Sequence, residues 1–236
     1  MKMSLFKKAL VASAFMVSAS SSYASLILTN PEDFQGTGLG SVNTILTIQN
    51  SGTETGSVSL RVDFNNGEDI ITGDAKTGAS QTQTRSFSEL GLTSATSLRV
   101  VFNAVEPGGD GRSILLEDLE LTLYSATGTM LFESGVFTPI TFENTLSGTG
   151  NSGFVFRLDP DQAAAAQLAA FTGNFSTNRV GLSATASMAA GGNETFFVAN
   201  SSMGVPPTEV PEPTTVGLLG LGLLGLAASR RKAARK

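Results

Sequence analysis

The stretch Val58-Ser-Leu-Arg-Val-Asp-Phe64 alternates apolar and polar side chains through all of its positions. Successive side chains of a β-strand point to opposite faces, so Val58, Leu60, Val62 and Phe64 would share one face of a strand. This period of two predicts a strand with one buried face and one face in water. Such strands are typical of antiparallel sheets, because parallel sheets are covered on both faces.

The same alternation recurs along the chain and decides the fold class. It is strong at residues 98–102, 119–123, 154–158 and 180–186, and weaker at 42–49, 83–87, 130–133, 136–142 and 195–199. Clusters of Gly, Asn and Asp separate these runs and supply the backbone conformations that turns need. We therefore predict that residues 25–204 form an all-β domain, an antiparallel, jelly-roll-like β-sandwich of about ten strands.

One segment departs from this pattern and predicts a short helix near 160–171. Asp159 stands at the N-cap, Pro160 at the first helical position and Gln162 at the third, which is the arrangement of a capping box. The residues that follow are rich in alanine, the strongest helix former, and Gly173 ends the segment. We expect this helix to connect two strands across an end of the sandwich.

The residue types that are missing exclude much chemistry. The 236 residues include no Cys, His or Trp. The chain therefore has no disulfide, no zinc site of sulfur and nitrogen ligands, and no nucleophile activated by an imidazole. Residues 25–229 carry seven basic and 20 acidic residues, a net charge of −13. A surface this acidic repels phosphate backbones, so we expect no nucleic-acid partner.

The first 24 residues have the pattern of a secretory signal peptide. A basic segment with Lys2, Lys7 and Lys8 precedes an apolar run at 9–17, and small residues end at Ala24. That run is too short for a helix to cross about 30 Å of hydrocarbon. We predict a signal helix that directs the chain to the Sec translocon, with signal peptidase cutting between Ala24 and Ser25.

The C-terminal residues repeat this design in reverse. A Pro-rich linker, 205–213, leads to an uncharged Leu/Gly-rich stretch, 214–229, and a basic tail, 230–236, follows with Arg230, Arg231 and Lys232. Basic residues directly after an apolar stretch stay on the cytoplasmic side. We therefore predict a transmembrane sorting helix at 214–229 with the acidic domain outside. Its short length and its four glycines favour a temporary hold over a permanent anchor.

The tripeptide Pro211-Glu212-Pro213, preceded by Val210, stands directly before the apolar stretch. Together with that stretch and the basic tail, it resembles the PEP-CTERM sorting domain of Gram-negative bacteria that make extracellular polysaccharide. The resemblance covers about residues 208–236. It implies that exosortase, a membrane-embedded protease, cuts near Pro211 and delivers the protein to the cell surface or its polysaccharide matrix. It implies nothing about residues 25–204.

Two groups of acidic residues are candidate sites. Asp63, Asn65 and Asp69 are spaced like the first ligands of a calcium loop, but Gly67 comes one position early and no Glu closes the loop. A structural turn after the strand accounts for the same residues, and we favour it. The second group is Glu106, Asp110, Glu117, Asp118 and Glu120. A glycosidase needs two carboxylates facing across a cleft, whereas the alternation places Asp118 and Glu120 together on a solvated face.

Three smaller signals carry little chemistry. Lys76-Thr77-Gly78 matches an element of penicillin-recognising serine enzymes, but residue 73 is Gly where their partner motif needs Ser. Tyr124 is the one Tyr after the signal peptide, so aromatic platforms for sugars are scarce. Glycosylation sequons begin at Asn174, Asn193 and Asn200.

These observations favour a non-enzymatic exported protein of the cell surface or extracellular matrix, associated with exopolysaccharide and biofilm. Its expected partners are the Sec translocon, signal peptidase, an exosortase-like enzyme and extracellular polysaccharide, and we assign no catalytic residue, metal or cofactor. The alternative is a glycan-binding β-sandwich module, with or without calcium.

Overall fold

A computed structural model gives the fold and describes residues 26–30, 43–62, 68–78, 80–104, 112–145 and 153–201. Strands predominate in these residues and one short α-helix interrupts them, as the sequence predicts, whereas a short 3-10 helix was not predicted. The elements are β1 (Leu26–Leu28), β2 (Thr44–Ile48), β3 (Ser51–Leu60), β4 (Asp69–Gly73), β5 (Arg85–Ser86), η1 (Ala95–Ser97), β6 (Leu98–Asn103), β7 (Arg112–Tyr124), β8 (Met130–Glu133), β9 (Ile140–Thr145), β10 (Gly153–Leu158), α1 (Pro160–Ala170), β11 (Arg179–Ala190) and β12 (Glu194–Asn200).

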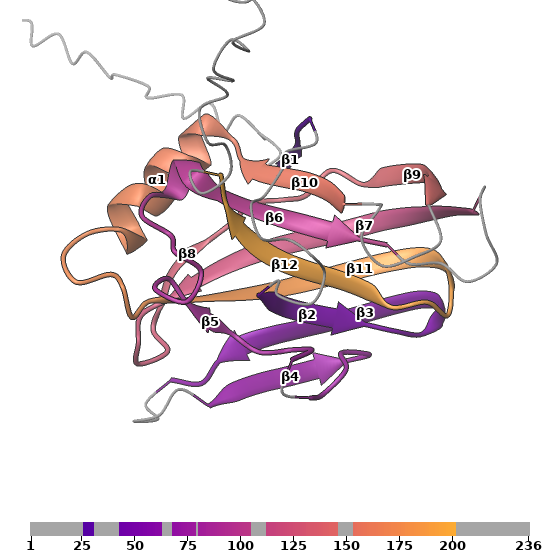
Figure 1. The fold of residues 1–236 in the computed structure, drawn as a ribbon, viewed down its shortest axis with the longest axis horizontal. Coiled ribbons are helices and arrows are strands. Elements are labelled where there is room, and N and C mark those ends of the chain that lie inside the picture. The colour runs from indigo at the N-terminus through magenta and orange to yellow at the C-terminus, as the bar shows by residue number, and fades with distance from the viewer. Residues whose placement is uncertain are drawn as a thin grey trace, which may run out of the picture.

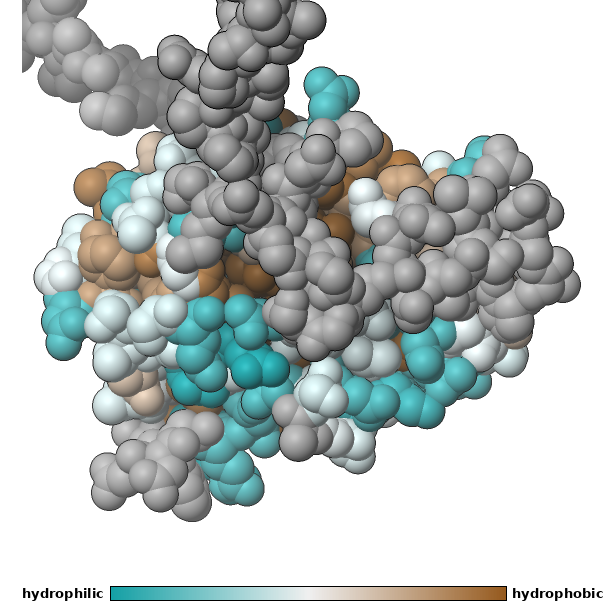
Figure 2. All heavy atoms as spheres, in the orientation of Figure 1, coloured by the Kyte–Doolittle hydropathy of each residue, from teal (hydrophilic) through white to brown (hydrophobic). Residues whose placement is uncertain are grey.

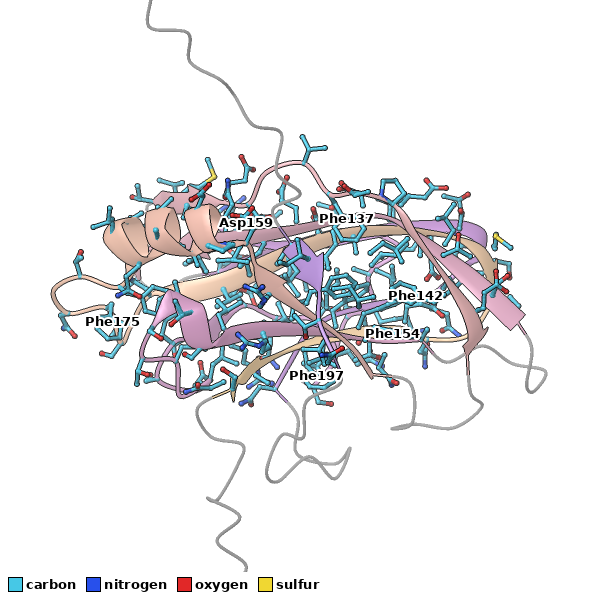
Figure 3. All side chains as sticks on the ribbon, turned by 90° about the horizontal axis from the view of Figure 1, so that it is seen from above. Phe137, Phe142, Phe154, Asp159, Phe175 and Phe197 are labelled. Carbon is cyan, nitrogen blue, oxygen red and sulfur yellow. The ribbon has the colours of Figure 1, made fainter. Side chains whose placement is uncertain are left out.

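The strands form two antiparallel sheets that lie as two layers (Figures 1 and 3). Sheet A has five strands in the order β1-β10-β6-β12-β2. Sheet B has seven: β4-β3-β11-β7-β8 in order, with β5 also paired to β11 and β9 to β7. Most neighbours in a sheet are distant in the chain, so the pairing depends on contacts between remote segments.

Phenylalanine side chains fill the space between the sheets. Phe102 of β6 and Phe196 of β12 are fully buried, and their rings stack at 4.8 Å between centroids. Phe142 from sheet B meets Phe154 from sheet A at 3.9 Å (Figure 3). The first pair joins neighbouring strands of sheet A and the second joins the two layers, and aromatic pairs contribute about 0.5–1.5 kcal/mol beyond the area that they bury.

The strand predicted at 58–64 begins and ends earlier in the structure. β3 runs from Ser51 to Leu60, and Val62, expected to be buried, is 56% exposed in a turn. The N–H of Arg61 donates to the carbonyl of Glu68 at 2.9 Å and leads the chain into β4. β4, β1 and the first halves of β3 and β7 were not predicted. Likewise, Val136 is 81% exposed, and the strand expected at 136–142 is β9, from Ile140 to Thr145.

β2 and β6 are buried on both faces, and the prediction of a single buried face was wrong for them. On the outer side of sheet A, Val101, Val155 and Phe197 lie opposite one another in register and form a second apolar cluster. Figure 3 shows Phe197 on the opposite side of β12 from the core phenylalanines. Residues 75, 76 and 83 cover the edge of β2, because Ala75 forms a bridge with Ile48 and the backbone N–H groups of Lys76 and Gln83 donate hydrogen bonds to carbonyls of β2. A covered edge resists pairing with another chain.

The predicted helix is confirmed as α1. The carboxylate of Asp159 accepts hydrogen bonds from the N–H groups of Asp161 and Gln162, each at 2.9 Å, and Phe171 caps the other end. The return bond of a capping box is not formed, because Oε1 of Gln162 has no hydrogen-bond partner in the described structure. Gln167 instead accepts from the N–H of Ala95 at 2.9 Å, which docks α1 on η1. The helix therefore closes one end of the sandwich.

Candidate functional site

The predicted processing residues lie outside the described residues. They are Ala24 and Ser25 at the signal cleavage site, Val210, Pro211, Glu212 and Pro213 of the sorting motif, and Arg230, Arg231 and Lys232 of the basic tail. The structure does define the strand that leads to the sorting motif. β12 ends at Asn200, whose side chain is 5% exposed and donates a hydrogen bond to the carbonyl of Gly91. Asn200 therefore fixes the point from which the C-terminal segment leaves the domain.

The two chain ends of the domain leave sheet A in one row. Leu26, the first residue of β1, lies opposite Leu158 of β10, and Asn200 lies opposite Leu98 of β6. The β10–β6 register pairs Phe156 with Val100, so two more residues bring Leu158 beside Leu98. With strands about 4.8 Å apart, Leu26 and Asn200 are roughly 14 Å from each other. The segments that carry the two predicted cleavage sites therefore begin at the same end of the sandwich.

Asp69, a candidate calcium ligand, takes part in the fold instead. Its carboxylate accepts hydrogen bonds from the backbone N–H of Thr84 at 3.0 Å and from the Thr84 hydroxyl at 2.6 Å. Arg179 donates to the same hydroxyl and to the Thr84 carbonyl, at 2.7 Å each. This network joins β4 to β5 and β11. Asp63 and Asn65 lie outside the described residues.

Asp74 has a similar structural role. One carboxylate oxygen accepts from the side chain of Asn50 at 2.9 Å and the other from the backbone N–H of Thr55 at 3.0 Å. In the described part of the chain, no group of three or more His, Cys, Asp or Glu side chains could hold a metal ion. Asp69 is the first residue of β4 and Asp74 follows β4, and both carboxylates are hydrogen-bonded within the fold. The predicted turn itself lies largely outside the described residues.

The acidic residues of β7 lie on the outer face of sheet B, as predicted. Leu119 and Leu121 are fully buried, whereas Asp118 is exposed and Glu120 is half-buried. A bulge at Glu117 shifts the register against β11 by one residue, so Leu116 also points inward. The carboxylate of Glu117 accepts from the Ser187 hydroxyl at 2.6 Å. Glu106 and Asp110 lie outside the described residues.

Glu120 is a described carboxyl group whose pKa is raised. Partial burial raises the pKa of Glu120, and the neighbouring Glu133 carboxylate on β8 raises it further. Two acids that share a hydrogen bond on an open sheet face have no cleft between them for a substrate. We therefore assign no catalytic role to this pair.

Hydroxyl groups occupy much of the outer face of sheet B. Thr55 and Thr185 lie within 3.1 Å of each other across β3 and β11, and Ser57 and Thr72 within 2.7 Å across β3 and β4. Tyr124 packs against this face over Gly181, where a Cβ atom would come within 2.9 Å of the ring. Burial raises the pKa of the Tyr124 phenol. Tyr124 is 9% exposed, which makes it a poor aromatic platform for a sugar.

The remaining sequence signals fall on structural or exposed positions. The Lys76 ammonium donates to the side-chain carbonyl of Gln49 at 2.5 Å, so this lysine fastens β2 to the segment after β4. Asn174 and Asn193 are exposed on turns, but Asn200 is buried and hydrogen-bonded. Two of the three sequons are therefore accessible.

Two features of the structure escaped sequence reasoning. The outer apolar cluster was missed, although adjacent Val100 and Val101 break the alternation in β6 and could have indicated it. The network of Asp69, Thr84 and Arg179 was also missed, and no local pattern marks it, because Arg179 is 95 residues from Thr84.

Figure 2 views the outer side of sheet A, where apolar residues show around α1 and polar ones gather below β12.

Comparison with known proteins identifies the C-terminal segment. Residues 209–232 match the family model of the PEP-CTERM protein-sorting motif. No curated protein and no solved structure matches the chain. No helix in the described residues is long and apolar enough to cross a membrane, and the predicted span at 214–229 lies outside them. The motif implies export, anchoring in a membrane and processing by exosortase, a membrane protease. The chain is therefore a protein that carries the PEP-CTERM sorting motif.

Proposed function

We propose that this protein is a non-enzymatic component of the cell surface or extracellular matrix of a Gram-negative bacterium, associated with its exopolysaccharide. A signal peptide, 1–24, directs export through the Sec translocon, and signal peptidase cuts between Ala24 and Ser25. The stretch 214–229 then holds the precursor in the inner membrane until an exosortase-like enzyme cuts near Pro211-Glu212-Pro213. The observation that carries this proposal is the sorting motif at 209–232, which follows a folded domain ending at Asn200.

The architecture supports a structural role for the exported domain. β2, β12, β6 and β10 lie side by side in sheet A, and β3, β11, β7 and β8 lie side by side in sheet B. The chain crosses between the sheets six times, from β2 to β3, β5 to β6, β6 to β7, β9 to β10, β10 to β11 and β11 to β12. This succession supports a jelly-roll-like fold. The described carboxylates Asp69, Asp74 and Glu117 are hydrogen-bonded within the fold, which supports a structural use of the acidic residues.

Processing is tested in the native host with two matched variants. In the first, Ala replaces each residue of Pro211-Glu212-Pro213, and we expect the precursor to stay in the membrane fraction. In the second, Ala replaces Pro206 and Pro207, which lie outside the matched segment, and processing should continue. Mass spectrometry of the extracellular wild-type protein should find a C-terminus near Val210–Pro213. Extracellular protein with an intact tail would contradict the proposal.

A second candidate function, a glycan-binding module, is supported by the hydroxyl groups on the outer face of sheet B. Jelly rolls include many lectin domains, and Thr55, Thr185, Ser57 and Thr72 offer donors and acceptors there. Processed protein from the host is sedimented with the host's own exopolysaccharide, with calcium or with a chelator. Saturable binding that Thr185→Val weakens, but that Thr127→Val in the β7–β8 turn does not, would favour this function. No binding at any polysaccharide concentration would exclude it.

A further inference from the structure

The position of the two chain ends indicates how the folded domain is oriented relative to the membrane in the precursor. The inference rests on the proposed function, because it assumes that the C-terminal stretch holds the domain at the membrane. Leu26 and Asn200 lie in the row across sheet A described above, next to η1 and the first turn of α1. The β2–β3 and β11–β12 turns lie at the opposite end of the same strands, since Glu194 pairs with Ile48 there.

The reach of the segment between the domain and the motif is compared with the length of β12, the strand that it follows. Residues 201–210 reach at most about 33–36 Å when fully extended. β12 has seven residues, so at about 3.4 Å per residue Asn200 stands roughly 20 Å above the turn end of its strand.

These lengths give the two orientations of the domain different free energies. With the row of chain ends toward the membrane, residues 201–210 need cover no part of the sandwich. With the domain turned over, they must first span the whole strand and the turn beyond it, which takes up more than half of their full reach. A chain stretched in this way loses conformational entropy, so the first orientation is favoured.

We propose that the end of the sandwich formed by η1 and the row from Leu26 to Asn200 faces the membrane while the precursor is held by its tail. The β2–β3 and β11–β12 turns then face away from the cell. After processing, the new C-terminus remains at the membrane-facing end. Surface partners of the matrix would therefore meet these turns first.

The chain has no Cys, so single cysteine variants report on one position each. Thr93→Cys and Thr96→Cys place a thiol at the membrane-facing end, and Ser51→Cys and Asn193→Cys place one at the turn end. All four residues are exposed. Each variant is made in the full-length precursor, with Ala in place of Pro211-Glu212-Pro213 so that it stays uncut, and is labelled with a fluorescent donor. Energy transfer is measured to an acceptor lipid in the outer leaflet of the isolated membranes.

We expect higher energy transfer from positions 93 and 96 than from positions 51 and 193. Inserting a long Gly/Ser segment after Met203 should reduce that difference, because a longer tether permits both orientations. Equal or reversed transfer in precursor that is held in the membrane would overturn the orientation and leave the proposed function standing. A difference that survives the insertion would also overturn the tether argument. Precursor missing from the membrane fraction would overturn both proposals.

Discussion

Replacing Asp69 with alanine distinguishes a carboxylate that holds the fold from one that holds a cation. Its oxygens accept two hydrogen bonds from Thr84, at 3.0 and 2.6 Å, and Thr84 is fully buried. A hydrogen bond to a charged group contributes about 1.5–3 kcal/mol, and a buried donor without its acceptor costs about 1–3 kcal/mol. Asp69 itself is half-buried, and water can replace part of the loss. We therefore expect Asp69→Ala to lower the free energy of unfolding by about 2–3 kcal/mol.

Thermal unfolding of processed protein, followed by circular dichroism, measures this loss. For a domain of this size, about 2–3 kcal/mol corresponds to a fall in melting temperature of roughly 4–12 °C. Asp118→Ala is the matched control, because Asp118 is an exposed carboxylate on β7, and its effect should stay within about 0.5 kcal/mol. Both variants and the wild type are melted with calcium and with a chelator.

Two outcomes would refute the structural role of Asp69. The first is a melting temperature that does not fall in Asp69→Ala, which would mean that its hydrogen bonds to Thr84 contribute nothing. The second is a wild-type melting temperature that rises with calcium while that of Asp69→Ala does not respond. That result would make Asp69 a calcium ligand and would favour the calcium-dependent alternative.

Three further substitutions follow from the structure. Gly181→Ala should lower the free energy of unfolding by about 1–3 kcal/mol, measured in urea, because its Cβ would come within 2.5 Å of the Val58 carbonyl. Gly153→Ala, with one contact at 3.2 Å to a side chain, should cost less. Asp159→Ala removes the N-cap of α1 and should cost about 1 kcal/mol, while Asp159→Asn retains most of the stability. Because the pKa of Glu120 is raised in the folded state, Glu120→Gln should stabilise the protein at pH 7. This gain should disappear as the pH falls through the raised pKa toward the ordinary glutamate range, and a gain that persists in acid would contradict the assigned cause.

Local sequence patterns predicted the elements that a few neighbouring residues are enough to encode. The alternation in β10, β11 and β12 located these strands to within a few residues of their ends, because one strand face is buried wherever two sheets pack. α1 was located for the same reason, since an N-cap Asp followed by Pro and a run of Ala fixes where a helix begins. Residues 209–232 were identified from their sequence alone, because a sorting signal is read as a linear segment.

Local patterns failed where contacts between distant segments decide the outcome. Asp69 was interpreted as part of a turn and β4 was not predicted, because only its pairing with β3 makes this segment a strand. β1 is too short to form an alternation, and it exists because Leu26 meets Leu158. Similarly, the sequence made Asp69 a candidate metal ligand, whereas in the fold its carboxylate accepts hydrogen bonds from Thr84.

The sequence by itself determined the all-β class, the position of α1 and the sorting motif, since each is encoded by neighbouring residues. Only the tertiary structure decided which strands share a sheet, that sheet A carries apolar side chains on both faces, and that both chain ends leave from one row. Those properties depend on pairings such as Leu26 with Leu158 and Asn200 with Leu98. Backbone hydrogen bonds between strands are alike for nearly all residues, so the packing of the whole chain, and no single segment, selects the partners.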